Sequence, residues 1–240
     1  MKQITSIKNE FVKELGKLSD YKEQKRQGKF LIEGYHLIEE ALKAGFLEKV
    51  LITKEEDAIA TVPNIMVTEE IIKKLAKTAN PQPILGICHI VDSQEIVGDR
   101  ILILDGISDP GNMGTIIRTA LGFNISTIII SADSCNLYND KVIRATQGAI
   151  FHMNFVIMDP LLVITELKKQ GILVIGTSLQ ASKPLEAITG VLRYALVLGN
   201  EARGISKEVA NNVDINIKIA INPALESLNV AIAGAIIMHY

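Results

Sequence analysis

One stretch of this 240-residue chain places two glycines, an amide and a guanidinium at the start of a predicted helix. Gly111 and Gly114 allow a ligand or another backbone to approach closely, because glycine has no side chain. Free N–H groups at a helix start attract anions, and the guanidinium of Arg118 presents paired donors that suit a phosphate. Asn112 projects from the same polar side of the helix. These residue types favour binding of a phosphate-bearing molecule.

Two further stretches share this character. One has glycines at 199 and 204 around an amide and a carboxylate, and the other places a hydroxyl and an amide before an Ala/Gly-rich apolar segment. Each stretch taken alone is typical of a turn followed by a helix cap. Three polar, flexible loops at the ends of predicted strands instead favour one shared site. The polar members of these two stretches are Asn200, Glu201, Ser227 and Asn229.

A dinucleotide-binding turn is a competing interpretation of the first stretch. Gly111 and Gly114 follow a predicted strand, and Asp133 lies about twenty residues further on, where such turns place an acid that contacts ribose. The full G-x-G-x-x-G pattern is missing, and neither Asn112 nor Arg118 has a role in that scheme. The sequence therefore disfavours this alternative.

The elements that must position these loops follow from the hydrophobic pattern. From residue 101 onward, short apolar runs alternate with helix-like segments. Continuous apolar strands between helices predict an α/β domain with a parallel sheet covered on both faces, and its ligands are expected outside the carboxyl ends of the strands. The predicted strands are 101–104, 127–131, 155–157, 172–176, 195–198 and 215–220, and the predicted helices are 112–122, 139–149, 160–169, 206–211 and 226–239.

Residues 1–95 are predicted to form a separate, small α/β domain, and the polar segment 92–99 is interpreted as a linker to a second domain, 101–240. Residues 1–30 carry eight basic and four acidic side chains, a net charge of +4. Four of these cations would share one face of a helix and could follow an RNA backbone, although an ordinary solvated helix explains them too. They are Lys22, Lys25, Arg26 and Lys29. The predicted strands are 30–34, 50–52 and 84–91, and the predicted helices are 36–44 and 69–76, the latter capped by Thr68.

The composition excludes several classes of protein. Hydrophobic residues make up 48% and charged residues 22% of the chain, as in globular proteins, and a net charge of -2 argues against a strongly basic nucleic-acid binder. Cys88 and Cys135 lie far apart and outside any metal-ligand spacing, so neither a disulfide nor a metal site is expected. The four histidines show no relay with Ser or Asp, which disfavours a hydrolase. Without an apolar leader or membrane-length run, a cytoplasmic protein is expected.

Taken together, the three polar stretches resemble the SpoU/TrmH-type RNA ribose 2′-O-methyltransferases of the SPOUT class. The family motifs N-x-G-x-x-x-R-T-A, G-N-E-x-x-G and E-S-L-N-V correspond to residues 112–120, 199–204 and 226–230, and residues 138–149 resemble the segment between the first two motifs. The N-terminal part is similar to the RNA-binding domain that often accompanies this family. The chain departs from the family pattern at Ala202, Ala220 and Pro223, which lie in turns that would hold the cofactor.

The resemblance implies a deep C-terminal trefoil knot, a homodimer, and S-adenosylmethionine as the cofactor without a metal. It implies transfer of the cofactor's methyl group to a ribose 2′-hydroxyl of RNA, with ribosomal RNA favoured over transfer RNA. A non-catalytic RNA-binding or ribosome-assembly protein is the alternative from another class. By resemblance, the catalytic residues are Asn112, Arg118, Glu201, Ser227 and Asn229, and the cofactor-binding residues are Thr177, Leu198, Gly199, Asn200, Ile219, Leu228 and Asn229.

The resemblance also implies roles for these side chains. Because Arg118 is protonated at neutral pH, it is expected to grip a phosphate and stabilise the developing alkoxide, and not to accept a proton. Asn112 would orient Arg118 or the nucleotide, and Glu201 would fix the loop or hold Arg118. Ser227 and Asn229 would contact the substrate phosphate and the cofactor, while Ile219 and Leu228 would enclose the adenine ring.

Overall fold

The computed structural model describes residues 1–90, 93, 95–178 and 182–240. Three residues of the predicted strand end and linker, Val91, Asp92 and Gln94, lie outside the described residues. The chain divides into two compact units. The first unit comprises Met1–Val91 and Asn136–His152, and the second unit comprises Asp92–Cys135 and Met153–Tyr240. Residues 136–152 thus group with the N-terminal part, although they lie within the predicted second domain, 101–240.

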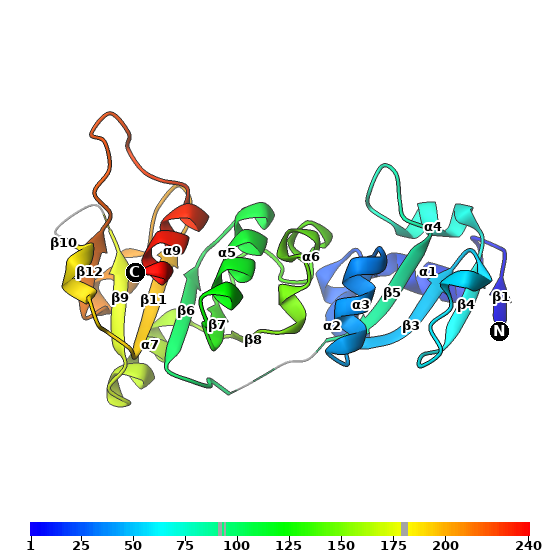
Figure 1. Ribbon diagram of the computed structural model, residues 1–240, viewed down its shortest axis with the longest axis horizontal. Helices are drawn as coiled ribbons and strands as arrows, with labels where there is room; N and C mark the ends of the chain where they lie inside the picture. Colours follow the sequence, from blue (N-terminus) through cyan, green and yellow to red (C-terminus); the bar gives the residue numbers. More distant parts are fainter. Residues whose placement is uncertain (91–92, 94, 179–181) are drawn as a thin grey trace. The chain divides into compact units, whose positions relative to one another are not determined.

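The second unit is built on a sheet in which every recorded pairing is parallel (Figure 1). This arrangement confirms the predicted α/β class with a parallel sheet, while the trefoil knot stays a prediction. Leu102, Leu104 and Leu198 are fully or almost fully buried, as expected for strands covered on both faces. In spatial order the described strands are β10 (Lys183–Pro184), β12 (Ile215–Lys218), β9 (Leu173–Thr177), β11 (Tyr194–Gly199), β6 (Arg100–Asp105), β7 (Thr127–Ile130) and β8 (Asn154–Ile157).

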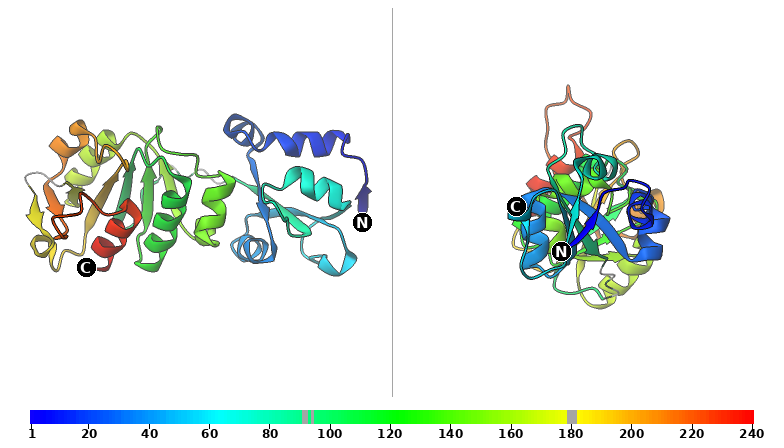
Figure 2. Two further views of the ribbon diagram at one scale, coloured as in Figure 1. Left: turned by 90° about the horizontal axis from the view of Figure 1, so that it is seen from above. Right: turned by 90° about the vertical axis from the view of Figure 1, so that its right-hand side faces the viewer.

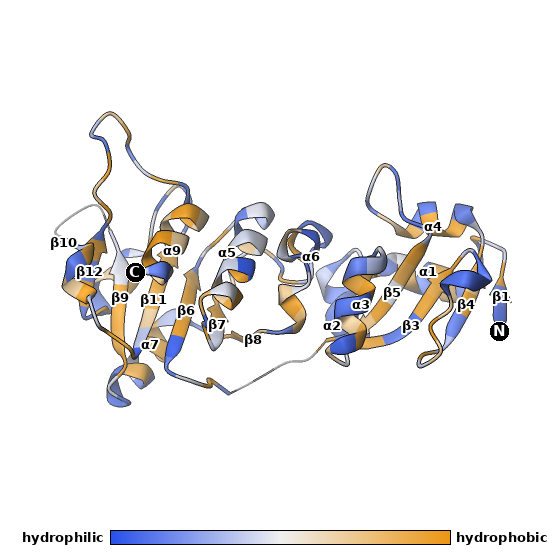
Figure 3. Ribbon diagram, viewed as in Figure 1, coloured by the Kyte–Doolittle hydropathy of each residue, from blue (hydrophilic) through white to orange (hydrophobic). Residues whose placement is uncertain are grey.

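Two pairs of helices cover this sheet. Helices α5 (Pro110–Gly122) and α9 (Val230–His239) pack together on one face, and α7 (Pro160–Lys169) and α8 (Lys207–Asn212) pack together on the other (Figure 2, left). A short 3-10 helix, η3 (Leu185–Ile188), precedes β11. Figure 3 shows mainly apolar residues in β6 and β11, and it shows that α9 is apolar over most of its length. Within the part of the chain that is described, no helix is long and apolar enough to span a bilayer.

Helix α9 begins later than the sequence pattern predicts. The predicted start at residue 226 is wrong, because Asn229 is the N-cap and its side chain accepts hydrogen bonds from the backbone N–H groups of Ala231 and Ile232. Further along the helix, a Cβ atom on Gly234 would lie 2.7 Å from Leu198 Cδ1. The missing side chain therefore lets α9 lie directly on β11.

The first unit contains a mixed sheet. Strand β5 pairs antiparallel with both β2 and β3, whereas β4 pairs parallel with β1 and β3. Two of the strands, β1 and β4, were not predicted, since each is short and buries only one or two residues. The order is β1 (Lys2–Ile4), β4 (Asn64–Val67), β3 (Leu47–Ile52), β5 (Ile84–His89) and β2 (Lys29–Glu33).

Helices α1 (Glu10–Lys17) and α4 (Glu69–Leu75) share an apolar cluster with one face of this sheet. Helix α4 starts at Thr68, whose hydroxyl accepts from the N–H of Ile71, as the sequence predicts. The remaining helical elements of the first unit are α2 (Tyr21–Gln27), α3 (Tyr35–Lys43), η1 (Glu55–Asp57), α6 (Asp140–Thr146) and η2 (Ala149–Phe151).

Residues 136–152 are fixed to the first unit by a buried amide and an aromatic contact. Gln24 donates to the carbonyl oxygens of Leu18 and Tyr138, at 2.8 and 3.0 Å, and the rings of Phe30 and Tyr138 lie 4.6 Å apart. The predicted helix 139–149 is too long. Gln147 and Gly148 both have positive φ angles, which end α6 and separate it from η2.

The basic face predicted near the N-terminus is smaller than expected. Lys29 lies in β2 and not on the helix that carries Lys22, Lys25 and Arg26. Arg26 forms ion pairs with Glu14 and Glu23, at 3.1 and 2.7 Å, and Lys29 pairs with Glu48. Exposed pairs of this kind contribute only about 0–1 kcal/mol. These cations can therefore exchange partners at little cost.

Candidate active site

The carboxylate of Glu201 joins two of the polar loops. It follows the carboxyl end of β11 and lies against the loop between β6 and α5. Its Oε2 accepts from the hydroxyl and the backbone N–H of Ser108, at 2.7 and 3.1 Å. Its Oε1 accepts from the N–H of Asp109 and from Asn112 Nδ2, at 3.1 and 3.0 Å. Four donors thus hold one carboxylate and fix the two loops to each other.

The third loop joins this arrangement through an amide. Asn229 Nδ2 donates to Asn112 Oδ1 at 2.8 Å, while Asn112 Nδ2 donates to Glu201. Asn229 also caps α9, and the backbone of Asn112 is held by the N-cap Asp109. Side chains from all three predicted motifs therefore form one continuous chain of hydrogen bonds, which we call the Asn112–Glu201–Asn229 network.

The pKa of Glu201 reflects this network. Partial burial acts to raise the pKa, but the hydrogen bonds from Asn112, Ser108 and the backbone outweigh it and lower the pKa to about 2. A carboxylate with so low a pKa stays ionised at neutral pH and is a weak proton acceptor. In this structure Glu201 is therefore an ionised acceptor that joins the two loops.

The turn after β11 has a second internal brace. Asn200 accepts from the N–H groups of Ala202 and Arg203, and its own Nδ2 donates to the carbonyl oxygen of Gly106 at 2.8 Å. A Cβ atom on Gly199 would lie 2.1 Å from the backbone of Gly204. Only glycine fits at position 199, because the turn folds back directly onto the end of the strand.

Two of the predicted catalytic residues lie outside the network. Arg118 is exposed on α5, roughly 9 Å along the helix axis from Asn112. Ser227 is exposed in the loop 219–229, which projects from the second unit (Figure 1). Among the described residues, neither side chain has a recorded hydrogen bond or ion pair. Both groups are therefore open to a ligand, and Glu201 does not hold Arg118.

The predicted cofactor-binding residues follow the carboxyl ends of three neighbouring strands. Thr177 ends β9 and donates to the carbonyl oxygen of Val197, while Leu198 and Gly199 end β11 and are buried. Ile219, directly after β12, and Leu228, before α9, are half-buried. Because β12, β9 and β11 are adjacent, the positions at their carboxyl ends, Ile219, Thr177 and Gly199, lie at the same end of the sheet.

Sequence reasoning missed Ser108 and Asp109, which supply three of the four donors to Glu201. Asp109 precedes Pro110, and a capping residue before proline is a helix-start signal that would place the start of α5 two residues earlier than predicted. Ser108 carries no local signal, because its partner is 93 residues away in the chain. Among the described residues, no cluster of three His, Cys, Asp or Glu side chains could hold a metal ion.

Comparison with protein families gives two matches. Residues 99–239 match the SpoU rRNA methylase family, and residues 9–86 match the MRM3-like substrate binding domain. Among curated relatives, the 23S rRNA (guanosine(2553)-2′-O)-methyltransferase RlmP of Bacillus subtilis is 35% identical over 100% of this chain and 99% of its own length.

Solved structures agree with these matches. The AdoMet-bound rRNA methyltransferase of Sinorhizobium meliloti has a TM-score of 0.89 at 28% identity, covering 99% of this chain and 95% of that one. An RNA methyltransferase of the TrmH family from Porphyromonas gingivalis has a TM-score of 0.86 at 30% identity, covering 95% of both chains. The resemblance drawn from the three motifs is confirmed: the chain belongs to the SpoU rRNA methylase family.

Proposed function

We propose that this protein transfers a methyl group from S-adenosylmethionine to a ribose 2′-hydroxyl of ribosomal RNA. The observation that carries the proposal is the Asn112–Glu201–Asn229 network, in which side chains of the three family motifs meet at the carboxyl ends of parallel strands. That edge is where open α/β sheets bind their ligands. Family membership supports the enzyme class, and the network supports the proposal that the site lies at these loops.

The residues at this edge fit the proposed cofactor. Backbone groups at Thr177, Leu198 and Gly199 would bond its polar edges, while Ile219 and Leu228 would enclose the adenine, since flat apolar rings are held by apolar side chains with a few polar contacts. The turn at Gly199 packs directly against the backbone of Gly204, which fixes the loop that would border the cofactor. When bound, the cofactor supplies an electrophilic methyl group on a sulfonium sulfur, which needs no metal for its transfer.

The chain's own groups then act on the RNA. The 2′-oxygen takes up the methyl group as the carbon–sulfur bond breaks and leaves a neutral thioether, and the hydroxyl proton passes to water or to a phosphate oxygen. Negative charge develops on the 2′-oxygen as that proton leaves, and a nearby cation stabilises it. Arg118, exposed and without a recorded partner among the described residues, can bind the adjacent phosphate and stabilise the developing charge. It stays protonated and does not take the proton. Ser227 would add a hydroxyl contact to the substrate phosphate.

Ribosomal RNA is the proposed substrate because the Bacillus subtilis relative, which matches the whole chain, is named for a 2′-O-methylation of 23S rRNA. The N-terminal unit supports the same choice, since residues 9–86 match a substrate-binding domain. A ribose 2′-hydroxyl exists in RNA and not in DNA. We take 23S rRNA as the first RNA to test. An enzyme that acts on bacterial ribosomal RNA would work in the cytoplasm.

We propose a homodimer on the basis of helix α9. Its residues are apolar almost all round, yet Ile232 and Ile236, together with the C-cap Tyr240, are spaced four residues apart and are 52%, 37% and 52% exposed. An apolar helix with one exposed stripe is typical of an element that packs against a partner. A second copy of the chain would bury this stripe. Sedimentation of the wild type and of Ile236→Glu would test it, since a dimer should dissociate when a charge enters its interface.

The activity is tested with labelled S-adenosylmethionine and 23S rRNA transcribed in vitro. We expect transfer of label to RNA, resistance of one phosphodiester bond to alkaline hydrolysis at the modified ribose, and binding of the cofactor by calorimetry. Transfer RNA serves as the competing substrate. Absence of cofactor binding at millimolar concentration, in a protein that still binds RNA, would overturn the proposal and support the ribosome-assembly alternative.

A further inference from the structure

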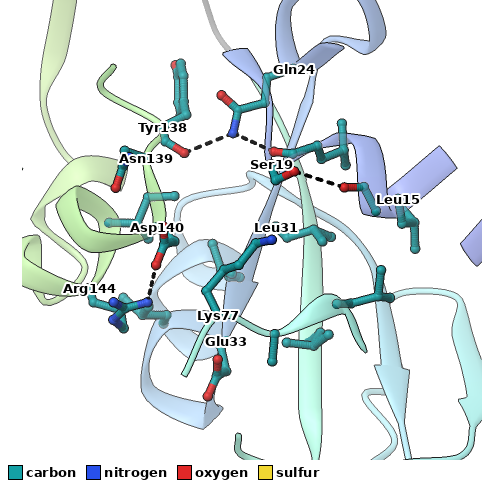
Figure 4. A pocket seen from close by; sticks show the side chains of 18 of the residues that line it. Leu15, Ser19, Gln24, Leu31, Glu33, Lys77, Tyr138, Asn139, Asp140 and Arg144 are labelled. Carbon is teal, nitrogen blue, oxygen red and sulfur yellow. Dashed lines mark hydrogen bonds and ion pairs between the residues drawn. The ribbon is translucent and has the colours of Figure 1, made fainter. Parts of the chain in front are cut away.

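A cleft in the first unit is lined by none of the residues assigned to the proposed reaction. It is bordered by α1 and the start of α2, by β2, by the end of α4 and by the first turns of α6 (Figure 4). Its floor is apolar and includes Leu15, Leu31 and Leu75. The cleft is open to solvent and is not a closed cavity. An open cleft of this kind suits a group that projects from a larger molecule.

The carboxylates at the rim of the cleft are already engaged. Asp140 accepts from Arg144 at 2.6 Å. Glu33 accepts from the hydroxyl of Thr78 at 2.6 Å and from the N–H of Gln82 at 3.2 Å, and its carboxylate points away from the cleft in Figure 4. The negative charge at the rim is therefore held by neighbouring donors.

The cations at the rim are less constrained. Lys77 extends across the cleft in Figure 4, and no hydrogen bond or ion pair to another described residue is recorded for it. Lys74 donates only to the backbone carbonyl of Ile7, at 3.0 Å. Two ammonium groups beside an apolar floor suit a ligand that joins an anionic group to a flat, apolar ring.

We propose that this cleft binds an unpaired nucleotide of the RNA substrate, away from the nucleotide that is methylated. The base would lie over the leucine floor and its phosphate would contact Lys77 and Lys74, because proteins read unpaired RNA by stacking the base and neutralising the backbone. Asn139, whose Oδ1 accepts from the N–H of Lys141, can turn its amide nitrogen toward the base edge. This inference rests on the proposed function, since it assumes an RNA substrate.

The test compares two charge reversals that lie close together in the chain. Lys77→Glu changes a cation that lines the cleft, whereas Lys73→Glu changes one on α4 that pairs with Glu69 and does not line it. With the full chain and 23S rRNA transcribed in vitro, we expect Lys77→Glu to raise the KM for RNA roughly tenfold at low salt. The slope of the logarithm of the RNA binding constant against the logarithm of the salt concentration should fall in magnitude by about one. The kcat and the affinity for S-adenosylmethionine should not change.

Lys77→Arg should restore most of the RNA affinity, which a merely structural defect would not allow. Equal KM values for Lys77→Glu and Lys73→Glu, in enzymes that still methylate the RNA, would overturn the cleft proposal and leave the proposed function intact. Failure of the wild type to methylate any RNA would instead remove the proposed function. The two failures are thereby distinguishable.

Discussion

Two halves of the same predicted site differ in how far their polar groups are already bonded. In one half, Asn112, Glu201 and Asn229 are joined by hydrogen bonds of 2.8 to 3.0 Å that require no ligand. In the other half, Arg118 and Ser227 are exposed and have no recorded partner among the described residues. The first half is a fixed support, and the second half presents groups to solvent.

This difference separates positioning from chemistry. A network that is complete before any ligand binds fixes the loops, so that no reorganisation is needed during the reaction. Groups that act on the substrate must keep free donors, and a buried or paired arginine could not meet an RNA phosphate. Substitutions in the two halves should therefore affect different quantities: activity in the exposed half, and stability together with activity in the network.

The largest effect is expected in the exposed half. Arg118→Ala should lower the kcat of methyl transfer by about 100- to 1,000-fold, as loss of one preorganised donor to a developing anion does in other enzymes. The melting temperature and the affinity for S-adenosylmethionine should stay close to those of the wild type, because Arg118 is exposed and forms no hydrogen bond or ion pair with the described residues. Single-turnover assays and calorimetry measure these quantities. A large loss of stability would show that Arg118 belongs to the support.

A smaller effect, on both stability and activity, is expected at Asn229, which caps α9 and bonds Asn112. Asn229→Ala removes the N-cap of α9 and the bond to Asn112, and should cost about 1 kcal/mol of unfolding free energy. Asn229→Ser keeps a capping oxygen but is too short to reach Asn112, so it should recover the stability and not the activity. Thermal unfolding and methyl-transfer rates of both variants give the answer. If serine restored the rate, the link to Asn112 would have no functional role.

The sequence predicts the sheet of the second unit better than that of the first. Strands such as Ile101–Leu104 are buried on both faces and form unbroken apolar runs, so the pattern alone locates them. Strands β1 and β4 were missed because only alternate residues are buried in β4, and β1 contributes only Ile4 to the core. The segment 136–152 belongs with the first unit through Gln24 and Phe30, contacts that span more than a hundred positions.

The candidate site was predicted as a set of residues but not as a set of contacts. The three motifs identified the family, and the structure places Asn112, Glu201 and Asn229 together as the resemblance implies. What no motif could give is the direction of each side chain. Asn112 bonds Glu201 and Asn229. It has no hydrogen bond to Arg118 among the described residues, because six positions of α5, roughly 9 Å of helix, separate the two. The assigned roles of these residues stay predictions.

The smallest effect is expected from Glu201→Gln, and its dependence on pH sharpens the comparison. The folded-state pKa of Glu201 is about 2, below its ordinary value of 4.5, so the carboxylate contributes stability above pH 4.5 and loses that contribution as the pH falls toward 2. Glutamine has one acceptor oxygen fewer and should cost about 1 kcal/mol at pH 7, a modest figure because the side chain is largely exposed. Urea unfolding should show this difference in unfolding free energy between the two proteins at pH 7 and a smaller difference at pH 3, because the contribution of the Glu201 carboxylate falls below pH 4.5. Other carboxyl groups titrate equally in both proteins and cancel from the comparison. A difference that is unchanged at pH 3 would mean that shape, and not charge, holds the loops.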